Sequence, residues 1–450
     1  MPLLALLLAL LSLGACSGSP EARLRRSLQV RSGIVRLPAG VVEISAEIRI
    51  PDGARDLEIV GAGDTVLRAA ANFRGRAILS AAGATRLRLR DFTIDGNRAA
   101  VARPLPMAPP ENYFRVYYPN NGLLADQARD LEIRGVRFRQ VANFAILVSR
   151  SRGVRIEDVT VEDSGSLAPK GRNNTTGGIL LEEGTADFRV AGCTLRNIRG
   201  NGIWTHSLYI SPRNQDGLIA QNRFDTIGRD AIQVGHATRI RVTGNAGVRT
   251  GYPAEMVDAE GGGTPVAIDT AGNVDQSSYE GNRFEETNGK CIDLDGFHDG
   301  EVRANVCVNR GAPQDYPFGH FGIVMNNTNP DMQSRNITIA GNRIEGTKFG
   351  GIFVIGSGHH IVGNQLLRLN TAHCNENAAR FGCYYFPGEP ELLESGIYLG
   401  RRAERPAVTR GNLILDNTIS GFRMKRRCIQ AAPGVRLAEN TIARNTCANQ

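Results

Sequence analysis

One repeat, which runs from about residue 120 to the C-terminal end, restricts the fold of this chain more than any other feature of its sequence. In each copy a small residue precedes an aliphatic one, and outward and inward positions alternate after it. Successive aliphatic residues are 23 to 45 residues apart. No long amphipathic helical pattern separates them, so we expect short strands joined by turns and stacked as a solenoid. The copies are Gly122-Leu123, Ala145-Ile146, Gly178-Ile179, Gly202-Ile203, Ala231-Ile232, Ala267-Ile268, Cys291-Ile292, Gly322-Ile323, Gly351-Ile352, Gly396-Ile397 and Cys428-Ile429.

A second column of residues, which follows each aliphatic one, is rich in asparagine. It reads Gly-Asn-x-aliphatic or a close variant of that pattern. An inward amide at the same turn of each coil can bond to the next coil and satisfy buried backbone groups, which an apolar side chain cannot do. The column therefore predicts a ladder of stacked asparagine side chains. It contains Asn222, Asn282, Asn342, Asn364 and Asn440, with Asn245, Asn305 and Asn412 in the same place and Cys193 replacing Asn in one coil.

Three segments near the start, Val35–Gly40, Leu57–Gly63 and Phe92–Asn97, resemble those that open a parallel β-helix. Together with the repeat they resemble the pectate-lyase-like superfamily over roughly residues 30 to 448. The resemblance implies an all-β fold, a single-domain right-handed parallel β-helix of about a dozen coils over residues 31–450. At ~4.8 Å per coil the rod is roughly 60 Å long. The alternative, a leucine-rich solenoid, has shorter and more regular repeats dominated by leucine.

The N-terminus resembles the signal sequence of a bacterial lipoprotein. Leu3–Leu13 is almost wholly apolar but too short to span a bilayer, and the sequence Leu-Gly-Ala-Cys that ends at Cys16 resembles a lipobox. This resemblance implies a signal peptide over residues 1–15, lipidation at Cys16 and a tether over residues 16–30. Ser17 resembles the sorting rule for the outer membrane. We therefore expect an exported protein, anchored in the bacterial cell envelope by lipid alone; a plain secretory signal is the alternative.

The formal net charge of +8 bears on the partners of the protein. Arginine-rich solvated turns explain it most simply, but it also favours an acidic partner such as a uronate polysaccharide or an anionic membrane. No run of Lys and Arg is interleaved with aromatic residues, so we do not expect a nucleic-acid partner.

Cysteine usage agrees with export, which permits disulfides. Seven cysteines follow Cys16, so at least one has no partner within the chain. Spacing alone does not fix the connectivity. We expect the pairs Cys291–Cys307, Cys374–Cys383 and Cys428–Cys447.

A β-helix places the same strand position of each coil in one surface column, so the repeat can be aligned to read a face. The first outward position contains Trp204, Gln233, Asp269, Asp293, Phe353 and Tyr398, and the second contains His206, Asp295 and Asn326. Carboxylates thus lie centrally, with aromatic residues on either side. Sugar rings stack on aromatic faces, and crowded carboxylates drive their pKa values apart, which creates an acid beside a base.

We therefore predict a catalytic set of Asp269, Asp293, Asp295 and the adjacent His298. The residues predicted to bind substrate are Trp204, His206, Gln233, Asn326, Phe353 and Tyr398. A competing interpretation is that Asp293 and Asp295 only begin a turn before Gly296. Three carboxylates could also bind Ca²⁺, which we keep as a candidate cofactor, whereas zinc-ligand spacing is absent from the sequence.

The reaction stays open at this point. The polygalacturonase signatures and the arginine-rich motif of pectate lyases are missing, so no known catalytic set carries over. Lys290 and Arg303 near the carboxylates could serve a lyase, and paired carboxyls could serve a glycoside hydrolase. We predict a monomeric cell-envelope polysaccharide-processing enzyme, a lyase or hydrolase, with an acidic groove. The alternative is a non-catalytic glycan-binding or structural surface lipoprotein, since adhesins and tail fibres share the fold.

Overall fold

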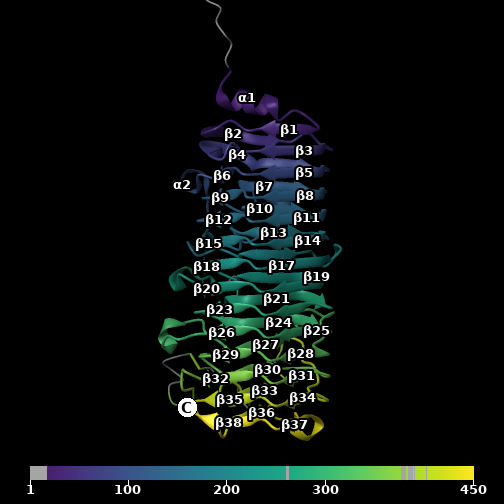
Figure 1. Cartoon of the computed structure of the whole chain (residues 1–450). Helices are drawn as coiled ribbons and strands as arrows, with labels where there is room; N and C mark the ends of the chain where they lie inside the picture. The colour runs from purple at the N-terminus through teal and green to yellow at the C-terminus, as the bar shows by residue number, and fades with distance from the viewer. Residues whose placement is uncertain are drawn as a thin grey trace, which may run out of the picture.

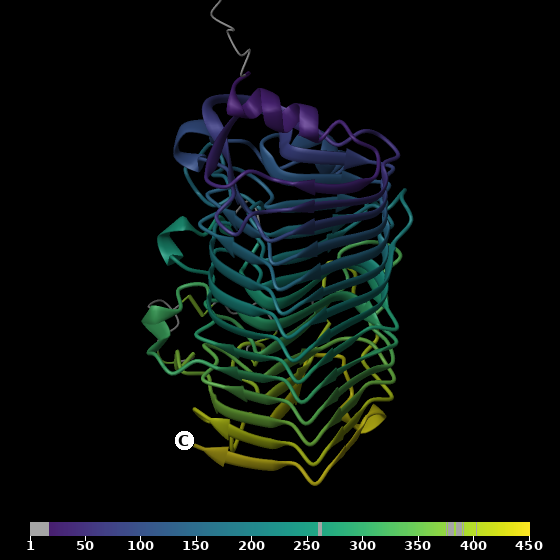
Figure 2. The same cartoon turned by 45° about the horizontal axis from the view of Figure 1, so that its top comes forward.

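The computed structural model describes residues 18–259, 263–374, 376, 382–383, 389, 391–401 and 403–450 as one stack of parallel coils. The chain winds downward from the purple N-terminal coil to the yellow C-terminal one (Figure 1), and the tilted view shows each coil as a bent loop above the next (Figure 2). Each regular coil contributes three short strands, so the rod has three faces. The all-β, single-domain fold is therefore confirmed.

The strands of each face pair in parallel with their counterparts one coil above and below. The first face contains β7 (Asn121–Asp126), β10 (Ile146–Ser149), β13 (Ile179–Glu182), β16 (Ile203–His206), β19 (Ile232–Thr243), β21 (Val266–Asp275), β24 (Lys290–His298), β27 (Ile323–Asn326), β30 (Ile352–Val354), β33 (Ile397–Leu399) and β36 (Ile429–Ala431). The second contains β1 (Gly33–Arg36), β3 (Arg55–Val60), β5 (Thr85–Arg90), β8 (Arg129–Arg134), β11 (Arg152–Glu157), β14 (Ala186–Ala191), β17 (Asn214–Ala220), β22 (Ser278–Glu280), β25 (Gly300–Arg303), β28 (Ile337–Ala340), β31 (His360–Val362), β34 (Leu413–Leu415) and β37 (Thr441–Ala443). The third contains β2 (Val41–Arg49), β4 (Val66–Ala82), β6 (Thr93–Asp95), β9 (Arg137–Arg139), β12 (Thr160–Glu162), β15 (Thr194–Ile198), β18 (Arg223–Ile227), β20 (Ala246–Thr250), β23 (Arg283–Glu285), β26 (Val306–Val308), β29 (Arg343–Glu345), β32 (Gln365–Leu369), β35 (Thr418–Gly421) and β38 (Thr446–Asn449). Long strands turn a corner between faces: the end of β4 pairs with β7 on the first face, and the second half of β19 pairs with β17 and β22 on the second.

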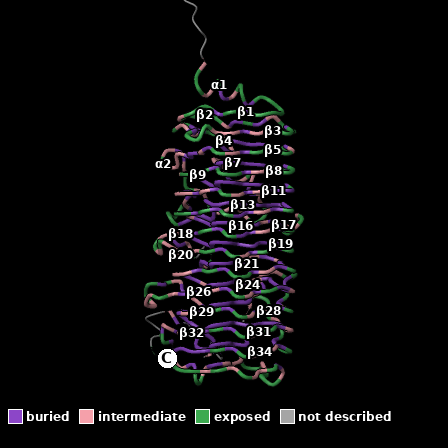
Figure 3. The backbone as a smooth tube through the Cα atoms, viewed as in Figure 1, coloured by how far each residue is buried: buried purple, intermediate pink, exposed green. Residues whose placement is uncertain are grey.

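The core is the inside of the rod, where the aliphatic residues of the repeat stack in columns. On the first face Ile203 pairs with Ile232, Ile232 with Ile268 and Ile268 with Ile292, and all four are buried. Buried segments recur from coil to coil of the tube (Figure 3), except in the strands of the last coil, which has no neighbour below it. Each added coil buries its own aliphatic side chains on those of its neighbours, which is why a period of about thirty residues is enough to build a long core.

The asparagine ladder forms along the corner before the third face. Asn222 Nδ2 donates to Asn245 Oδ1, and Asn245 Nδ2 donates to Asn282 Oδ1, each at a distance of 2.9 Å. Asn222 Oδ1 also accepts the backbone N–H of Cys193 at 3.0 Å, so Cys193 does take the place of an asparagine in its coil. Buried amides thereby satisfy both one another and the turn backbone. The ladder continues through Asn305, Asn342, Asn364, Asn417 and Asn445.

Two asparagines differ from the prediction. Asn412 and Asn440 bond to each other at 3.0 Å, and Asn412 also accepts the N–H of His359, so they form a separate ladder at the corner between the first and second faces. Asn417 takes the place predicted for Asn412. The long insertion after residue 370 breaks the spacing of the repeat, so the sequence pattern does not show which asparagine of the last coils belongs to the ladder.

The N-terminal end of the rod is covered by α1 (Pro20–Ser27). Its N-cap Ser19 accepts the N–H of Ala22, and Leu24 and Leu28 pack into the core. Residues 20–28 therefore differ from the tether that the sequence suggested: the apolar residues of this segment close the open end of the core. The predicted signal peptide and the lipidation site Cys16 lie outside the described residues.

Insertions leave the coils at their corners. They include α2 (Arg98–Val101), α3 (Phe114–Tyr117) and the 3₁₀ turns Ala254–Met256, Pro313–Asp315 and Leu437–Glu439. No helix in the described part of the chain is long and apolar enough to cross a membrane.

The three predicted disulfides, Cys291–Cys307, Cys374–Cys383 and Cys428–Cys447, are confirmed, and Cys193 is buried with a free thiol.

Candidate active site

The register of the first face places the predicted carboxylates next to one another. Gln233 pairs with Asp269 and, one coil further, Ile268 and Ala271 pair with Ile292 and Asp295. Asp269 and Asp293 are therefore direct neighbours across adjacent strands, about 4.8 Å apart along the rod. The outward columns read from the sequence match the observed pairing.

Four charged side chains gather here, and we call Asp230, Asp269, Lys290 and Asp293 the acid cluster. Asp230 and Lys290 sit two residues before the buried isoleucines of β19 and β24, and Asp269 and Asp293 sit one residue after those of β21 and β24. The three carboxyl residues are 3%, 8% and 6% exposed, in sequence order. Such burial makes the protonation state of each group depend on its immediate partners.

Specific contacts hold the two central carboxyls. Gln233 Nε2 donates to Asp269 Oδ2 at 2.5 Å, and Asn201 Nδ2 donates to Gln233 Oε1 at 2.7 Å. Lys290 Nζ forms an ion pair with Asp293 Oδ2. The other oxygen of Asp293, Oδ1, is buried with no hydrogen-bond partner in the described structure. That oxygen is a free acceptor facing into the cluster.

Burial and crowding give the carboxyls of the cluster different electrostatic surroundings. Burial, and then the charges of Asp230 and Asp293, raise the pKa of Asp269 well above its usual range. Burial likewise raises the pKa of Asp230 to about 6. Although burial acts against it, the Asp293 carboxylate raises the pKa of Lys290, so this ammonium stays charged. The protonated form of Asp269 is thus favoured beside the ion pair of Lys290 and Asp293.

A pocket of about 270 Å³ opens next to the acid cluster. Lys290, His320 and Asn326 supply its polar lining, while Phe353 and Leu392 are among its apolar residues. Burial lowers the pKa of His320 to about 3, so its ring is neutral. Lys290 is the member of the acid cluster that lines the pocket, whose apolar faces and few polar groups suit a sugar ring.

Asp295 lies on the second outward column and binds a loop. Its Oδ1 accepts the N–H of Thr328 at 2.9 Å, and its Oδ2 accepts the hydroxyl at 2.6 Å. Burial, which outweighs these bonds, raises the pKa of Asp295 to about 6. These contacts give Asp295 a positioning role at the edge of the cluster.

The structure separates His298 from the carboxylates. Its Nδ1 lies 2.8 Å from Asp299 Oδ2 and its Nε2 lies 2.9 Å from Asn273 Oδ1. The corner at Gly296 turns the chain from the first face to the second, which carries His298 away from Asp293. With both ring nitrogens engaged, His298 serves the corner and not the acid cluster.

Of the aromatic and imidazole residues predicted to bind substrate, Trp204, Phe353 and Tyr398 are buried and His206 is half-buried. Trp204 is only 7% exposed and belongs to a satellite core with Phe114 and Tyr118, which the insertion before β7 supplies. His206 stacks on Phe114 with ring centroids 4.3 Å apart. Tyr398 is fully buried and stacks on Phe353. Column alignment does not reveal which loops fold back over a face, and this is why these assignments differ from the structure.

Asp230 was missed as a site residue by the sequence reasoning. It lies two residues before the repeat isoleucine Ile232, and the same position before Ile292 holds Lys290. Aligning the position two residues before each repeat isoleucine would have revealed both.

Among the described residues, Glu182, Glu183 and His206 form a group able to hold a metal, with ligand atoms within 4.8 Å of one another. The backbone N–H groups of Phe114 and Arg115 already donate to the Glu182 carboxyl, each at a distance of 3.0 Å. Burial raises the pKa of Glu182 to about 7. A cation here would have to compete with these bonds and with a proton.

Known structures share the fold at low identity. PfbA, a surface adhesin of Streptococcus pneumoniae, aligns with a TM-score of 0.57 and 12% identity over 79% of this chain and 89% of its own. The N-terminal fragment of gene product 12 of bacteriophage Phi29 aligns with a TM-score of 0.59 and 13% identity, over 86% of this chain and 62% of that one. DFA-IIIase from Arthrobacter chlorophenolicus A6, in complex with GF2, aligns with a TM-score of 0.52 and 12% identity over 78% and 92%.

These similarities establish the fold and leave the reaction undecided, because an adhesin, a phage protein and an enzyme share it. No curated protein matches the sequence. The family model for the right-handed beta helix region matches residues 112–251 and 262–366, more than half of the chain. With the parallel coils and the asparagine ladder, this match shows that the chain belongs to the family of right-handed β-helix proteins.

Proposed function

We propose that this protein hydrolyses glycosidic bonds of a polysaccharide at the acid cluster, with Asp269 as general acid and Asp293 as base. One observation carries the proposal: two neighbouring buried carboxyls have different partners. Burial and like charges raise the pKa of Asp269 well above its usual range, while Lys290 pairs with Asp293. Two carboxyls with separated roles are what glycoside hydrolysis requires.

The steps of hydrolysis follow from the different partners of Asp269 and Asp293. Asp269, oriented by Gln233, gives its proton to the glycosidic oxygen as the bond from that oxygen to the anomeric carbon breaks. Asp293 accepts a proton from water, and the remaining hydroxide adds to the anomeric carbon. Lys290 stabilises the carboxylate before the step and fixes its position. The net change is one glycosidic bond broken and one water consumed.

Hydrolysis is favoured over elimination by the state of Lys290. A lyase needs a base that removes the proton next to a uronate carboxylate and a cation that stabilises the resulting charge. The raised pKa of Lys290 keeps it protonated, so it cannot be that base, and its charge is already paired with Asp293. Arg303, the other cation considered, pairs with Glu301 on the second face, at 2.8 Å.

The test is digestion of a panel of acidic and neutral polysaccharides by the purified protein, with Ca²⁺ or with chelator. Reducing ends and the absorbance of unsaturated uronates are both measured. We expect new reducing ends without that absorbance. New absorbance would replace hydrolysis by elimination. Tight retention of a glycan whose length never changes would instead make this a binding rod, as its similarity in fold to a surface adhesin allows.

We also propose that the protein is exported and anchored in the cell envelope through a lipid on Cys16. Support comes from the Leu-Gly-Ala-Cys sequence and the disulfides. In a bacterial host the wild-type protein should enter the membrane fraction, whereas Cys16→Ser should not. Membrane association that survives this change would contradict the anchor.

A further inference from the structure

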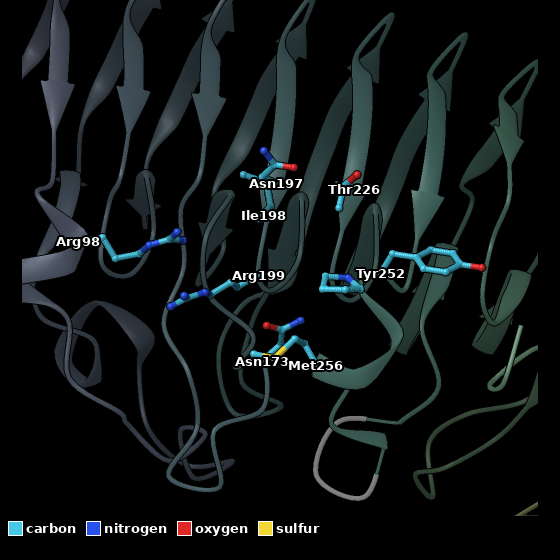
Figure 4. A pocket seen from close by; sticks show the side chains of 9 residues that line it. Arg98, Asn173, Asn197, Ile198, Arg199, Thr226, Tyr252 and Met256 are labelled. Atoms are coloured by element: carbon cyan, nitrogen blue, oxygen red, sulfur yellow. The ribbon is translucent and has the colours of Figure 1, made fainter. Parts of the chain in front are cut away.

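A second pocket lies at the corner where the third face turns into the first, just after β15 and β18. It has a volume of about 240 Å³, and Arg98, Asn173, Arg199, Tyr252 and Met256 are among its lining residues. A neighbouring pocket of about 330 Å³ shares both arginines. In Figure 4 the two guanidinium groups extend into the same part of the pocket, with Asn173 and Met256 below them and Tyr252 at the far end.

The charges of these arginines are not balanced by a carboxylate. Arg196 lies on β15, three residues before Arg199, and is typical of the exposed arginines. It forms an ion pair with Glu162 at 2.5 Å. Arg98 forms no ion pair within the described ranges, and its Nη1 is buried without any partner. The single bond of the Arg199 guanidinium there is to the carbonyl of Gly165, at 3.4 Å.

The electrostatics of the pocket agree with an unbalanced pair of cations. Burial, and then the charge of Arg199, lower the pKa of Arg98 to about 10. Burial also lowers the pKa of Arg199. Asp163 acts on Arg98 only from a distance, and its Oδ1 accepts from Asn197 Nδ2 at 3.1 Å. Two cations brought together in a partly buried site are stabilised by an anion that both can reach.

Asn173 adds an independent sign of a missing acceptor. The residue is 2% exposed, and its Nδ2 is buried with no acceptor among the described residues. A buried amide donor without a partner is costly and rare. Two guanidinium groups in one pocket call for a ligand with several acceptor oxygens, such as a carboxylate or a sulfate.

We infer that Arg98 and Arg199 bind the carboxylate or sulfate group of an acidic sugar. The ring of Tyr252 and the side chain of Met256 give the pocket apolar surface for a sugar face, and the two connected pockets have room for more than a small ion. Arg199 lies two residues before Asn201, which bonds to Gln233 beside Asp269. An acidic chain could thus span this corner and the acid cluster, although the binding site stands without the proposed hydrolysis.

Binding is measured by calorimetry of the full chain with glucuronate, glucose, inorganic sulfate and inorganic phosphate. We expect glucuronate to bind and glucose to bind at least about 10-fold more weakly, since charge-assisted bonds are lost. Arg98→Gln and Arg199→Gln should each weaken glucuronate by about 10-fold or more. Arg196→Gln, which changes a nearby arginine of β15 that is paired with Glu162, should leave the affinity unchanged.

Equal affinity for glucose and glucuronate would overturn the inference, as would an equal loss in Arg196→Gln. Binding of inorganic sulfate or phosphate without glucuronate would overturn the sugar part. Should a variant fail to fold, competition between sulfate and glucuronate on the wild-type protein still decides, because a shared site requires displacement. Asp269→Asn should keep the affinity for glucuronate, so a failure of hydrolysis is distinguishable from a failure of this site.

Discussion

The acid cluster and the pocket of Arg98 and Arg199 are adjacent, but they treat buried charge in opposite ways. In the acid cluster Lys290 balances Asp293, Gln233 holds Asp269, and the remaining repulsion is relieved by keeping a proton. In the arginine pocket two cations face each other with donors left unpaired.

The difference is what separates a site for chemistry from a site for binding. A catalytic group must be held in one protonation state before substrate arrives, so its partners belong to the protein. A recognition group keeps its partner position open for the ligand. Substitutions in the two regions should therefore change the free energy of unfolding with opposite signs.

The largest effect is expected on turnover. Asp269→Asn removes the transferable proton but keeps the size of a neutral carboxyl, so the rate should fall by about 10²- to 10⁴-fold. Stability at neutral pH should barely change, because the raised pKa of Asp269 favours its uncharged form in the native state. The rate of release of reducing ends and urea unfolding measure the two. The control is Asp225→Asn. Asp225 lies on β18 and pairs with Arg249 near the surface, so this change should lower neither the rate nor the stability.

Removing the cation of the acid cluster should destabilise the fold. Lys290→Met leaves the Asp293 carboxylate buried and unpaired, and we expect the free energy of unfolding to fall by about 3–5 kcal/mol. Adding Asp293→Asn to this variant should restore a large part of the loss. If urea unfolding finds the single variant as stable as the wild type, the ion pair is not what holds the cluster.

The pH dependence of the free energy of unfolding tests the burial of Asp295, at the edge of the acid cluster. The pKa of Asp295 is raised to about 6, so its protonated form stabilises the native state below its unfolded pKa near 4, and this contribution is lost as pH rises from about 4 to 6. Asp295→Asn should reduce the fall in unfolding free energy over this range by roughly 2–3 kcal/mol. An unchanged pH profile in the variant would argue against a buried Asp295.

The smallest effect, and the opposite sign, is expected in the arginine pocket. Arg98→Gln removes one of two facing cations, so the unfolding free energy without ligand should stay equal or rise by about 1 kcal/mol, since lost packing offsets part of the relief. Chemical denaturation beside Lys290→Met gives the comparison. A loss as large as that of Lys290→Met would mean that Arg98 has a structural partner and would end the contrast.

The fold and the columns could be predicted because they depend on strict alternation. The pairing of Ile268 with Ile292 follows from one small-aliphatic pattern, and it fixes Asp269 beside Asp293 without knowledge of any loop. The asparagine ladder follows from the same regularity.

What could not be predicted depends on segments that fold back over the rod. Phe114 comes from an irregular insertion, yet it decides that Trp204 and His206 are covered. The arginine pocket likewise joins α2, the end of β15 and the turn near Met256, which are far apart in sequence. No periodicity links such residues, so only the structure brings them together.

The coils tolerate very different lengths between equivalent strands. Ile268 and Ile292 are 24 residues apart and Ile352 and Ile397 are 45 apart, yet both pairs keep their register. A loop at a corner can therefore be lengthened, shortened or exchanged in evolution without moving the carboxyl column. Selectivity and reaction chemistry can then be inherited separately, the first through the corners and the second through the stacked strands.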